Sequence, residues 1–225
     1  MISSIQTLLA VLASSGVVGI SDQYLVLALV GLAVHLGLVV PAGPVAFIGH
    51  PWFIGVAVVG WLVTVIPAVF PHEPVTNAIV NFMSGPVSLV SGAVVALASA
   101  GMLEGVRPEL AGSLYLLRRD AAWLSFNEYR SADLLVLGGG AAIAGGLTFM
   151  KFMAKPGIAS HTGTWGTGAG MAFAATEAGL AVTLTPLMLW LQGQDPWLLI
   201  ALGLVIALVA VFVLVVSIRW LLEAR

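Results

Sequence analysis

The sequence predicts an all-α fold, a polytopic bundle of about seven transmembrane helices with a parallel 3+1+3 internal repeat. Its 225 residues are 60% hydrophobic and only 8% charged, and the mean hydropathy is +1.09. A soluble domain has about 25% charged residues on average, so this chain lacks the ionic surface that such a domain needs. The composition therefore predicts an integral membrane protein whose first partner is the lipid bilayer.

The few charged residues exclude several classes of function. Lys and Arg number 8 against 10 Asp and Glu, and half of these charges fall within residues 104–133, so we expect no basic face for nucleic acid. Cys is absent, which excludes disulfides, thiolate nucleophiles and Cys-ligated metals. No nucleophile elbow or zinc-protease helix occurs either, so we do not expect an enzyme.

Seven apolar segments are long enough, or nearly so, to provide the roughly 20 residues that a transmembrane helix needs. The first lacks the basic residues and the cleavage site of a signal peptide, so we expect it to be a span. The segments run from Ser4 to Val18, Tyr24 to Val40, Pro51 to Phe70, Ser84 to Leu103, Leu134 to Met150, Thr167 to Leu191 and Pro196 to Leu222.

Shifting the sequence by 145 positions places the second and third spans over the sixth and seventh. Pro41 then falls on Pro186, and Pro51-Trp52 falls on Pro196-Trp197. In both copies a helix has Pro in its first turn and Trp at the membrane boundary. We interpret the match as a duplication, although two apolar helices always align to some extent.

The duplication divides the chain into four parts. Residues 1–72 form the first three-helix repeat, 73–103 the connector span, 104–133 a polar interfacial helix or loop, and 134–225 the second three-helix repeat. In the polar part, Arg118, Arg119 and Trp123 fit a helix lying on the membrane surface. By the positive-inside rule, its basic residues predict that this part and the N-terminus face the cytoplasm, with the protein in the cell inner membrane.

Small residues at every fourth position predict close helix contacts within the membrane. Spans four, five and six each carry such a stripe, and we expect the stripes to be buried against other helices. Other membrane subunits and self-association are further candidate partners. The stripes are Ser84, Ser88, Gly92 and Ala96 in span four, Gly138, Ala142 and Gly146 in span five, and Gly166 and Gly170 in span six.

The order of several short motifs points to a known family. They are Ser15-Gly16, Tyr24-Leu25, Gly31-Leu32-Ala33, Pro51-Trp52, Ile66-Pro67, Gly85-Pro86, Ala154-Lys155, Gly157 and Glu177. Nearly the whole chain resembles an uncharacterised bacterial integral-membrane family, domain of unknown function four-one-two-six. The resemblance implies a small multi-span inner-membrane protein without an assigned activity. In one departure, Trp61, Thr64 and Val65 stand where the family carries charged residues late in its third span.

Glu177 is the ionisable residue that the predicted spans place farthest from a membrane surface. It follows Gly166 by 11 residues, roughly 16 Å along a helix, which puts it near the bilayer midplane. Such residues usually mark a transport pathway or a binding site, so Glu177 is a candidate proton, cation or polar-substrate site. A structural role stays open, in which the buried carboxyl is protonated or is paired with Lys151, Lys155 or a backbone N–H.

A second candidate region is the irregular backbone before span six. Pro and Gly interrupt the helical pattern between Lys155 and Gly168, and the duplication places this segment over Ser14 to Asp22. Unwound backbone at matching places in two repeats indicates a transport site, although an ordinary external loop has the same composition. The predicted site comprises Glu177, His161, Thr162, Thr164, Thr167 and Asp22.

The four histidines do not share a helix at metal-ligand spacing. We therefore expect no metal or other cofactor, while ligation of a pigment or haem by one of them stays open. The function we expect is a small permease or channel-like transporter with an acidic midplane site. The alternative is a non-catalytic structural or accessory subunit of a larger membrane complex, which the loss of the family's charges in span three favours.

Overall fold

The structure is a computed structural model that describes residues 2–39, 47–69, 85–96, 98–100, 130–162, 167–192 and 194–223. Within these ranges the regular structure consists of helices, which confirms the predicted all-α class. The helices are α1 (Ile2–Ile20), α2 (Gln23–His35), α3 (Pro51–Val69), α6 (Arg130–Thr162), α7 (Thr167–Gln192) and α8 (Pro196–Glu223). A further helix, Gly85–Ala100, lies between α3 and α6 in the chain.

Three of the described helices are long and apolar enough to cross a membrane. Their candidate spans are Val136–Ile158 in α6, Met171–Gln192 in α7 and Trp197–Glu223 in α8. Large apolar side chains on α8 such as Leu208 and Phe212 are exposed, as expected of a surface that faces lipid rather than water. These helices support the prediction of a membrane protein, while the seven-span bundle and the inner membrane stay predictions.

The α2 helix is shorter than the sequence indicated. We predicted a span from Tyr24 to Val40, but the helix ends at His35, and its 13 residues extend only about 20 Å. Gly37 follows with a φ of 69°, in the left-handed region that glycine adopts at little cost and that commonly ends a helix. Since a bilayer core is about 30 Å thick, α2 does not reach across it.

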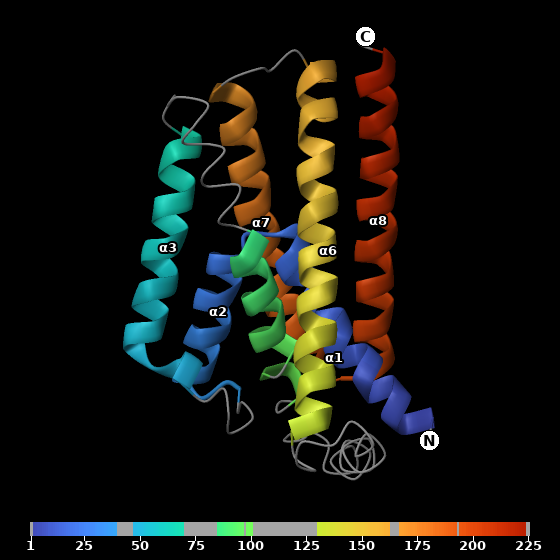
Figure 1. Cartoon of the computed structure of the whole chain (residues 1–225). Coiled ribbons are helices and arrows are strands. Elements are labelled where there is room, and N and C mark those ends of the chain that lie inside the picture. The colour runs from blue at the N-terminus through green and yellow to red at the C-terminus, as the bar shows by residue number, and fades with distance from the viewer. Residues whose placement is uncertain are drawn as a thin grey trace.

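Figure 1 shows that α1 and α2 form an antiparallel pair that turns inside the bundle. The α1 helix rises beside α6 to about half its height, the chain turns at Ser21 and Asp22, and α2 descends on the other side. The interior position of α1 explains its composition, because Val11, Val17 and Val18 have no exposed surface. The turn between the two helices therefore lies in the middle of the protein.

The helix directions in Figure 1 agree with those that a parallel repeat requires. In each set of three, α1 to α3 and α6 to α8, the first and third helices rise and the second descends. The sets differ at their first turn, since the α1–α2 turn lies within the bundle whereas α6 ends and α7 begins at its upper end. The duplication itself stays a prediction.

The stripe of the Gly85–Ala100 helix faces α1 and α6. A Cβ atom on Gly92 would lie 2.6 Å from the carbonyl oxygen of Gly140, and Ser88 and Ala96 have no exposed surface. Ser84 and Gly166 lie outside the described residues, and of Gly170 only the backbone is described. The glycine allows the two helices to approach at backbone distance, which is how small residues stabilise helix contacts in lipid.

The described residues do not bury the stripe predicted for span five. None of their atoms lies within 4 Å of a Cβ built on Gly138 or Gly146, and Ala142 is exposed. The buried face of α6 instead carries Gly140 and Ala144. The span is so rich in Gly and Ala that four-residue spacings occur on more than one face, and spacing alone did not identify the buried one.

We predict that Gly92→Ala lowers the free energy of unfolding by about 1 to 3 kcal/mol, because overpacking forces the backbones of two helices apart. Thermal unfolding in detergent measures the effect. Gly146→Ala is the matched control, since its new methyl group meets open space. Equal melting temperatures for the two variants would contradict the backbone contact between Gly92 and Gly140.

Candidate functional site

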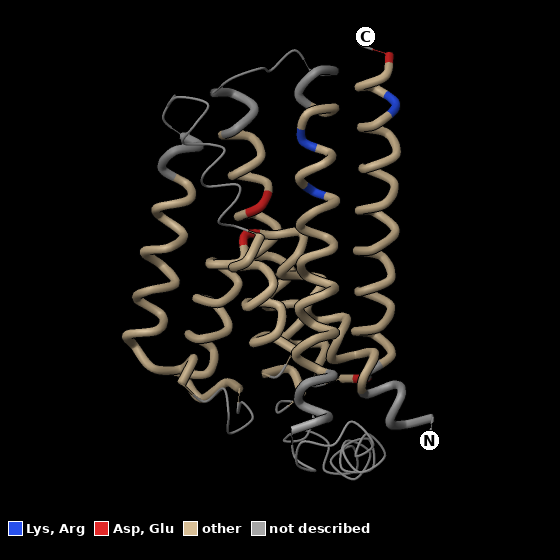
Figure 2. Tube along the Cα trace, viewed as in Figure 1, with Lys and Arg blue, Asp and Glu red and all other residues tan. Residues whose placement is uncertain are grey.

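Two lysines of α6 and one glutamate of α7 form a mostly buried ion-pair group. Glu177 Oε1 lies 2.8 Å from Lys155 Nζ, and Glu177 Oε2 lies 3.4 Å from Lys151 Nζ. The Glu177 side chain is 17% exposed, and those of Lys151 and Lys155 are 16% and 25% exposed. Figure 2 shows the two basic positions of α6 beside the acidic positions of α7 and of the α1–α2 turn.

The two lysines share one face of α6 because they are four residues apart. Two like charges so placed repel each other, and the carboxylate of Glu177 offsets this repulsion by approaching both. The Lys155 ammonium also lies 5.3 Å from the ring centroid of Phe152 and 5.5 Å from that of Phe173, within the range of cation–π attraction. The two aromatic rings and the Glu177 carboxylate together stabilise the positive charge of Lys155.

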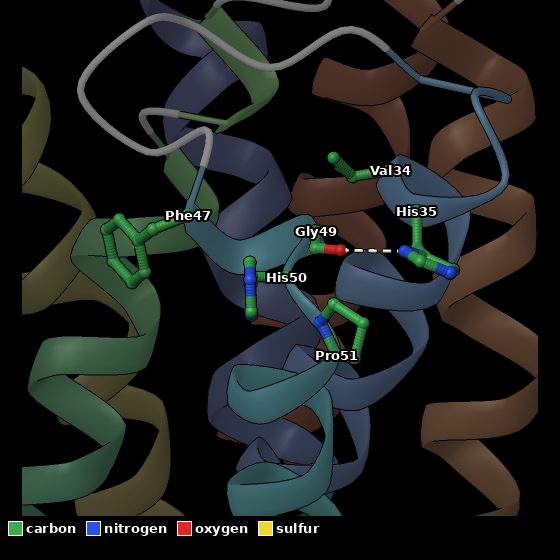
Figure 3. Close-up of a pocket in the computed structure, with 6 residues that line it drawn as sticks. All are labelled: Val34, His35, Phe47, Gly49, His50 and Pro51. Carbon is green, nitrogen blue, oxygen red and sulfur yellow. Dashed lines mark hydrogen bonds between the residues drawn. The ribbon is translucent and has the colours of Figure 1, made fainter.

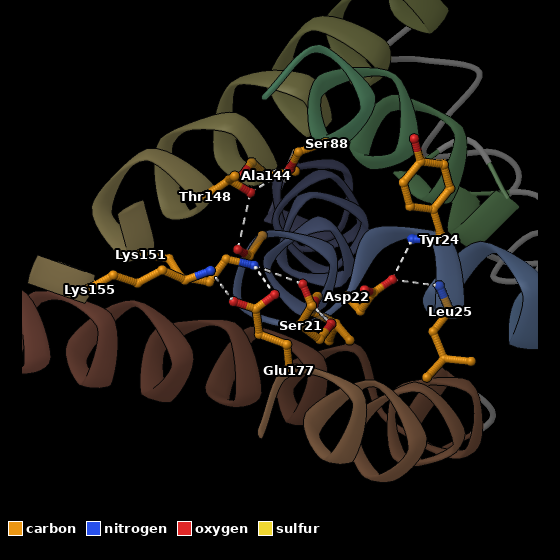
Figure 4. Close-up of polar contacts among 12 residues, drawn as sticks. Ser21, Asp22, Tyr24, Leu25, Ser88, Ala144, Thr148, Lys151, Lys155 and Glu177 are labelled. Carbon is orange, nitrogen blue, oxygen red and sulfur yellow. Dashed lines mark hydrogen bonds and ion pairs between the residues drawn. The ribbon is translucent and has the colours of Figure 1, made fainter. Parts of the chain in front are cut away.

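The turn between α1 and α2 lies directly against this group (Figure 4). Lys151 Nζ donates a hydrogen bond of 3.0 Å to the carbonyl oxygen of Ser21, a favourable place for a cation because helix C-terminal ends carry partial negative charge. The backbone N–H of Asp22 donates to the carbonyl oxygen of Glu177 at 3.2 Å. The broken backbone is therefore paired with both α6 and α7.

Asp22 caps the start of α2. Its Oδ1 accepts hydrogen bonds of 3.0 Å from the backbone N–H groups of Tyr24 and Leu25, which satisfies two of the donors that the first turn of a helix leaves unpaired. Asp22 is 8% exposed. We call Asp22, Lys151, Lys155 and Glu177 the charged cluster; its formal charge is zero, which lowers the cost of burying it compared with a lone carboxylate.

A pair of hydroxyl groups lies one helical turn from Lys151. Thr148 Oγ1 donates to the carbonyl oxygen of Gly19 at 3.1 Å and lies 2.6 Å from Ser88 Oγ. Ser88 Oγ in turn contacts the carbonyl oxygen of Ala144 at 3.2 Å. Figure 4 shows these contacts leading away from the charged cluster. We had assigned Ser88 to helix contact alone and had not singled out Thr148.

The structure brings together two of the six predicted site residues, Asp22 and Glu177. It also contains the Lys pairing that we had left open as a structural role for Glu177. Along the candidate span Met171–Gln192, Glu177 is six residues from the beginning, or roughly 9 Å. Its position at the midplane stays a prediction.

The side chains of the other four predicted residues, His161, Thr162, Thr164 and Thr167, lie outside the described part of the chain. His161 and Thr162 end α6, and Thr167 begins α7, ten residues or roughly 15 Å along the helix from Glu177. Only the backbone of these three is described. Thr164 and the interfacial residues Arg118, Arg119 and Trp123 lie outside the described residues, so their roles stay predictions.

A separate surface hollow of about 590 Å³ lies where α2 ends and α3 begins (Figure 3). His35 Nδ1 lies 3.0 Å from the carbonyl oxygen of Gly49, and Trp52 N–H donates to His50 Nδ1 at 3.4 Å. Among the described side chains no group of three potential metal ligands occurs. The two histidines thus contact the connection between the helices. The hollow is lined by Val34, His35, Phe47, Gly49, His50 and Pro51.

No protein-family model, curated protein or solved structure matches this chain. The resemblance to the uncharacterised bacterial membrane family stays a prediction. The contacts around Glu177 are therefore the basis on which a function can be proposed.

We predict a coupling free energy of about 1 to 3 kcal/mol between Glu177 and Lys155, the size typical of directly contacting groups. Glu177→Gln leaves two ammonium groups without their carboxylate, so that Lys155→Met should cost less in that background than in the wild type. A double-mutant cycle of unfolding in detergent measures the difference. The exposed pair Arg219 and Glu223, 2.7 Å apart, is the matched control and should couple more weakly. Additive effects at Glu177 and Lys155 would refute the pairing.

Proposed function

We propose that the protein is a small permease or channel-like transporter whose site is the α1–α2 turn together with the charged cluster. One observation carries the proposal, the buried break at Ser21 and Asp22 against Lys151 and Glu177. Backbone without helical pairing at membrane depth is tolerated only where protein buries it or where it lines a cavity. Secondary transporters use such discontinuous helices to form their binding sites.

The ion pairs give this site a means of changing state. Moving Glu177 away from Lys155 would free one charge of each sign next to the ends of α1 and α2. A transported ion or polar solute could then take the place of one partner, since exchange of charged partners maintains neutrality in a medium of low dielectric constant. In this proposal Glu177 exchanges its charged partner, and Lys151 stabilises the α1–α2 turn.

The proposed architecture keeps seven membrane helices in a 3+1+3 arrangement in the inner membrane, with the N-terminus and residues 104–133 on the cytoplasmic side. The up-down-up order of both helix sets supports this arrangement. We propose one site, in the first set, because its first turn lies inside the bundle, whereas α6 ends and α7 begins at the upper end. In this proposal α1 and α2 enter the membrane and return to the same side.

An accessory-subunit role is the second candidate, and the uncovered small-residue stripe of α6 favours it. Gly138, Ala142 and Gly146 form a face that no helix of the described residues covers, and such faces associate in lipid. Gly146→Leu would then abolish a complex that native mass spectrometry of mild detergent extracts detects. A wild-type protein that is monomeric in those extracts excludes this role.

We predict that liposomes containing the wild-type protein pass protons or a small polar solute and that Glu177→Gln abolishes this flux, because the amide cannot exchange charge. Glu223→Gln, at the exposed end of α8, is the matched control and should retain the wild-type rate. A pH-sensitive dye and a panel of labelled solutes measure the fluxes. An absence of flux in every form would refute the transport proposal.

A further inference from the structure

The buried face of α7 carries polar side chains far below Glu177. Positions 177, 181, 185, 188 and 192 follow one another at intervals of three or four residues, so they lie on one face. Thr185 and Gln192 on this face are 0% and 1% exposed. From Glu177 to Gln192 the helix extends roughly 22 Å.

The Gly85–Ala100 helix presents three buried serines toward the same interior. Ser88, Ser91 and Ser99 are 0% exposed, and Gln192 Nε2 donates to Ser99 Oγ at 2.7 Å. This helix and α7 descend in the same direction (Figure 1). Thr185 and Gly92 each precede that contact by seven residues. Thr185 therefore lies level with Gly92, next to Ser91 in the chain, and about 10 Å above the contact between Gln192 and Ser99.

Three polar atoms in this interior have no hydrogen-bond partner in the described part of the chain. They are Ser91 Oγ, Thr185 Oγ1 and Gln192 Oε1. Other α7 hydroxyls behave differently, because Thr176 and Thr183 each donate at 2.8 Å to the carbonyl oxygen four residues earlier. A buried hydroxyl that does not pair with its own helix destabilises the fold unless another partner is present.

Water is the partner that suits three such atoms in one interior. Folded proteins hold about one buried water per 27 residues, which gives about eight for a chain of this length. Closer to Lys151, the Ser88 and Thr148 hydroxyls lie 2.6 Å apart, with Thr148 one turn below Lys151 on α6. We call this set of polar residues the polar seam; its members are Gln192, Ser99, Thr185, Ser91, Ser88 and Thr148.

We propose that the polar seam holds a file of water molecules and conducts protons between the Gln192 end of the bundle and Glu177. This inference rests on the proposed transport function and names its ion. The 2.6 Å contact between Ser88 and Thr148 leaves no room for a solute, but hydroxyls and waters pass a proton by accepting one and donating another. A hydronium ion at the Gln192 end becomes water, and the Glu177 carboxylate becomes a carboxylic acid that releases Lys155.

Met188 tests for the water file directly. It lies between Thr185 and Gln192 on the same face and is 1% exposed, so bulk solvent does not reach it. X-ray pulses convert bound water into hydroxyl radicals, which oxidise adjacent methionine. We expect Met188 to be oxidised in the wild-type protein, and several-fold more slowly in the double variant Ser91→Ala/Thr185→Val.

Proton flux into liposomes tests the second part of the proposal. Ser91→Ala/Thr185→Val should reduce the flux several-fold, while Thr183→Val, the same substitution on the exposed face of α7, should retain the wild-type rate. The double variant should fold, because it removes only unpaired hydroxyls, and its melting temperature checks this.

The outcomes separate this inference from the transport proposal. If Met188 is not oxidised in the wild-type protein, the water file is refuted, even if a flux that requires Glu177 is observed. Oxidised Met188 with unchanged proton flux in the double variant overturns the proton route, while a solute flux lost in Glu177→Gln still supports transport. Loss of both Met188 oxidation and proton flux in the double variant alone supports the inference.

Discussion

The ammonium group of Lys151 is the contact on which the arrangement of the interior depends. It donates to the carbonyl oxygen of Ser21 at the end of α1 and pairs with the carboxylate of Glu177 on α7. One atom of α6 thereby contacts both the end of α1 and the side chain of Glu177 on α7. In an apolar interior each of these groups would be costly alone, and together they compensate one another.

Small residues make this interior possible because they let backbones approach. Ser15 Oγ reaches the carbonyl oxygen of Gly92 at 3.1 Å, and a Cβ on Gly140 would lie 2.7 Å from the same oxygen. Serine in these positions is short enough for close contact and still carries a hydroxyl. Small and hydroxyl-bearing residues therefore account both for the close helix contacts and for the polar seam. The two features share the same helix faces.

The helices were predictable from the sequence because the length of an apolar segment is a local property. All seven expected segments have a described helix, yet the end of α2 was misplaced, since the left-handed backbone at Gly37 ended it before the apolar composition changed. The orientation of α6 was also beyond prediction, because Gly138 and Gly140 are equally small and only the neighbouring helices distinguish them. Glu177 and Asp22 were found because charge in an apolar segment is rare.

The sequence suggested several possible partners for Glu177 but did not show which of them it contacts. Lys151 and Lys155 follow an apolar segment of α6 and could have extended to a membrane surface with their ammonium groups in water. In the structure Lys151 points inward, toward the end of α1. This contact joins residues far apart in the sequence, so a local sequence pattern does not predict it. The unpaired hydroxyls of the seam were hidden for the same reason, since serine in a membrane helix commonly pairs with its own backbone.

The energetics of the charged cluster favour a role beyond cohesion. Apolar side chains of similar volume can replace a buried ion pair without loss, and often with a gain of about 1 to 4 kcal/mol. The Ser21 carbonyl needs only a hydrogen-bond donor, which a neutral hydroxyl would supply at lower desolvation cost. An ammonium at Lys151 is thus accounted for by the charge of Glu177, and in the proposed transport function Glu177 is the carboxylate that gains or loses a proton or a charged partner.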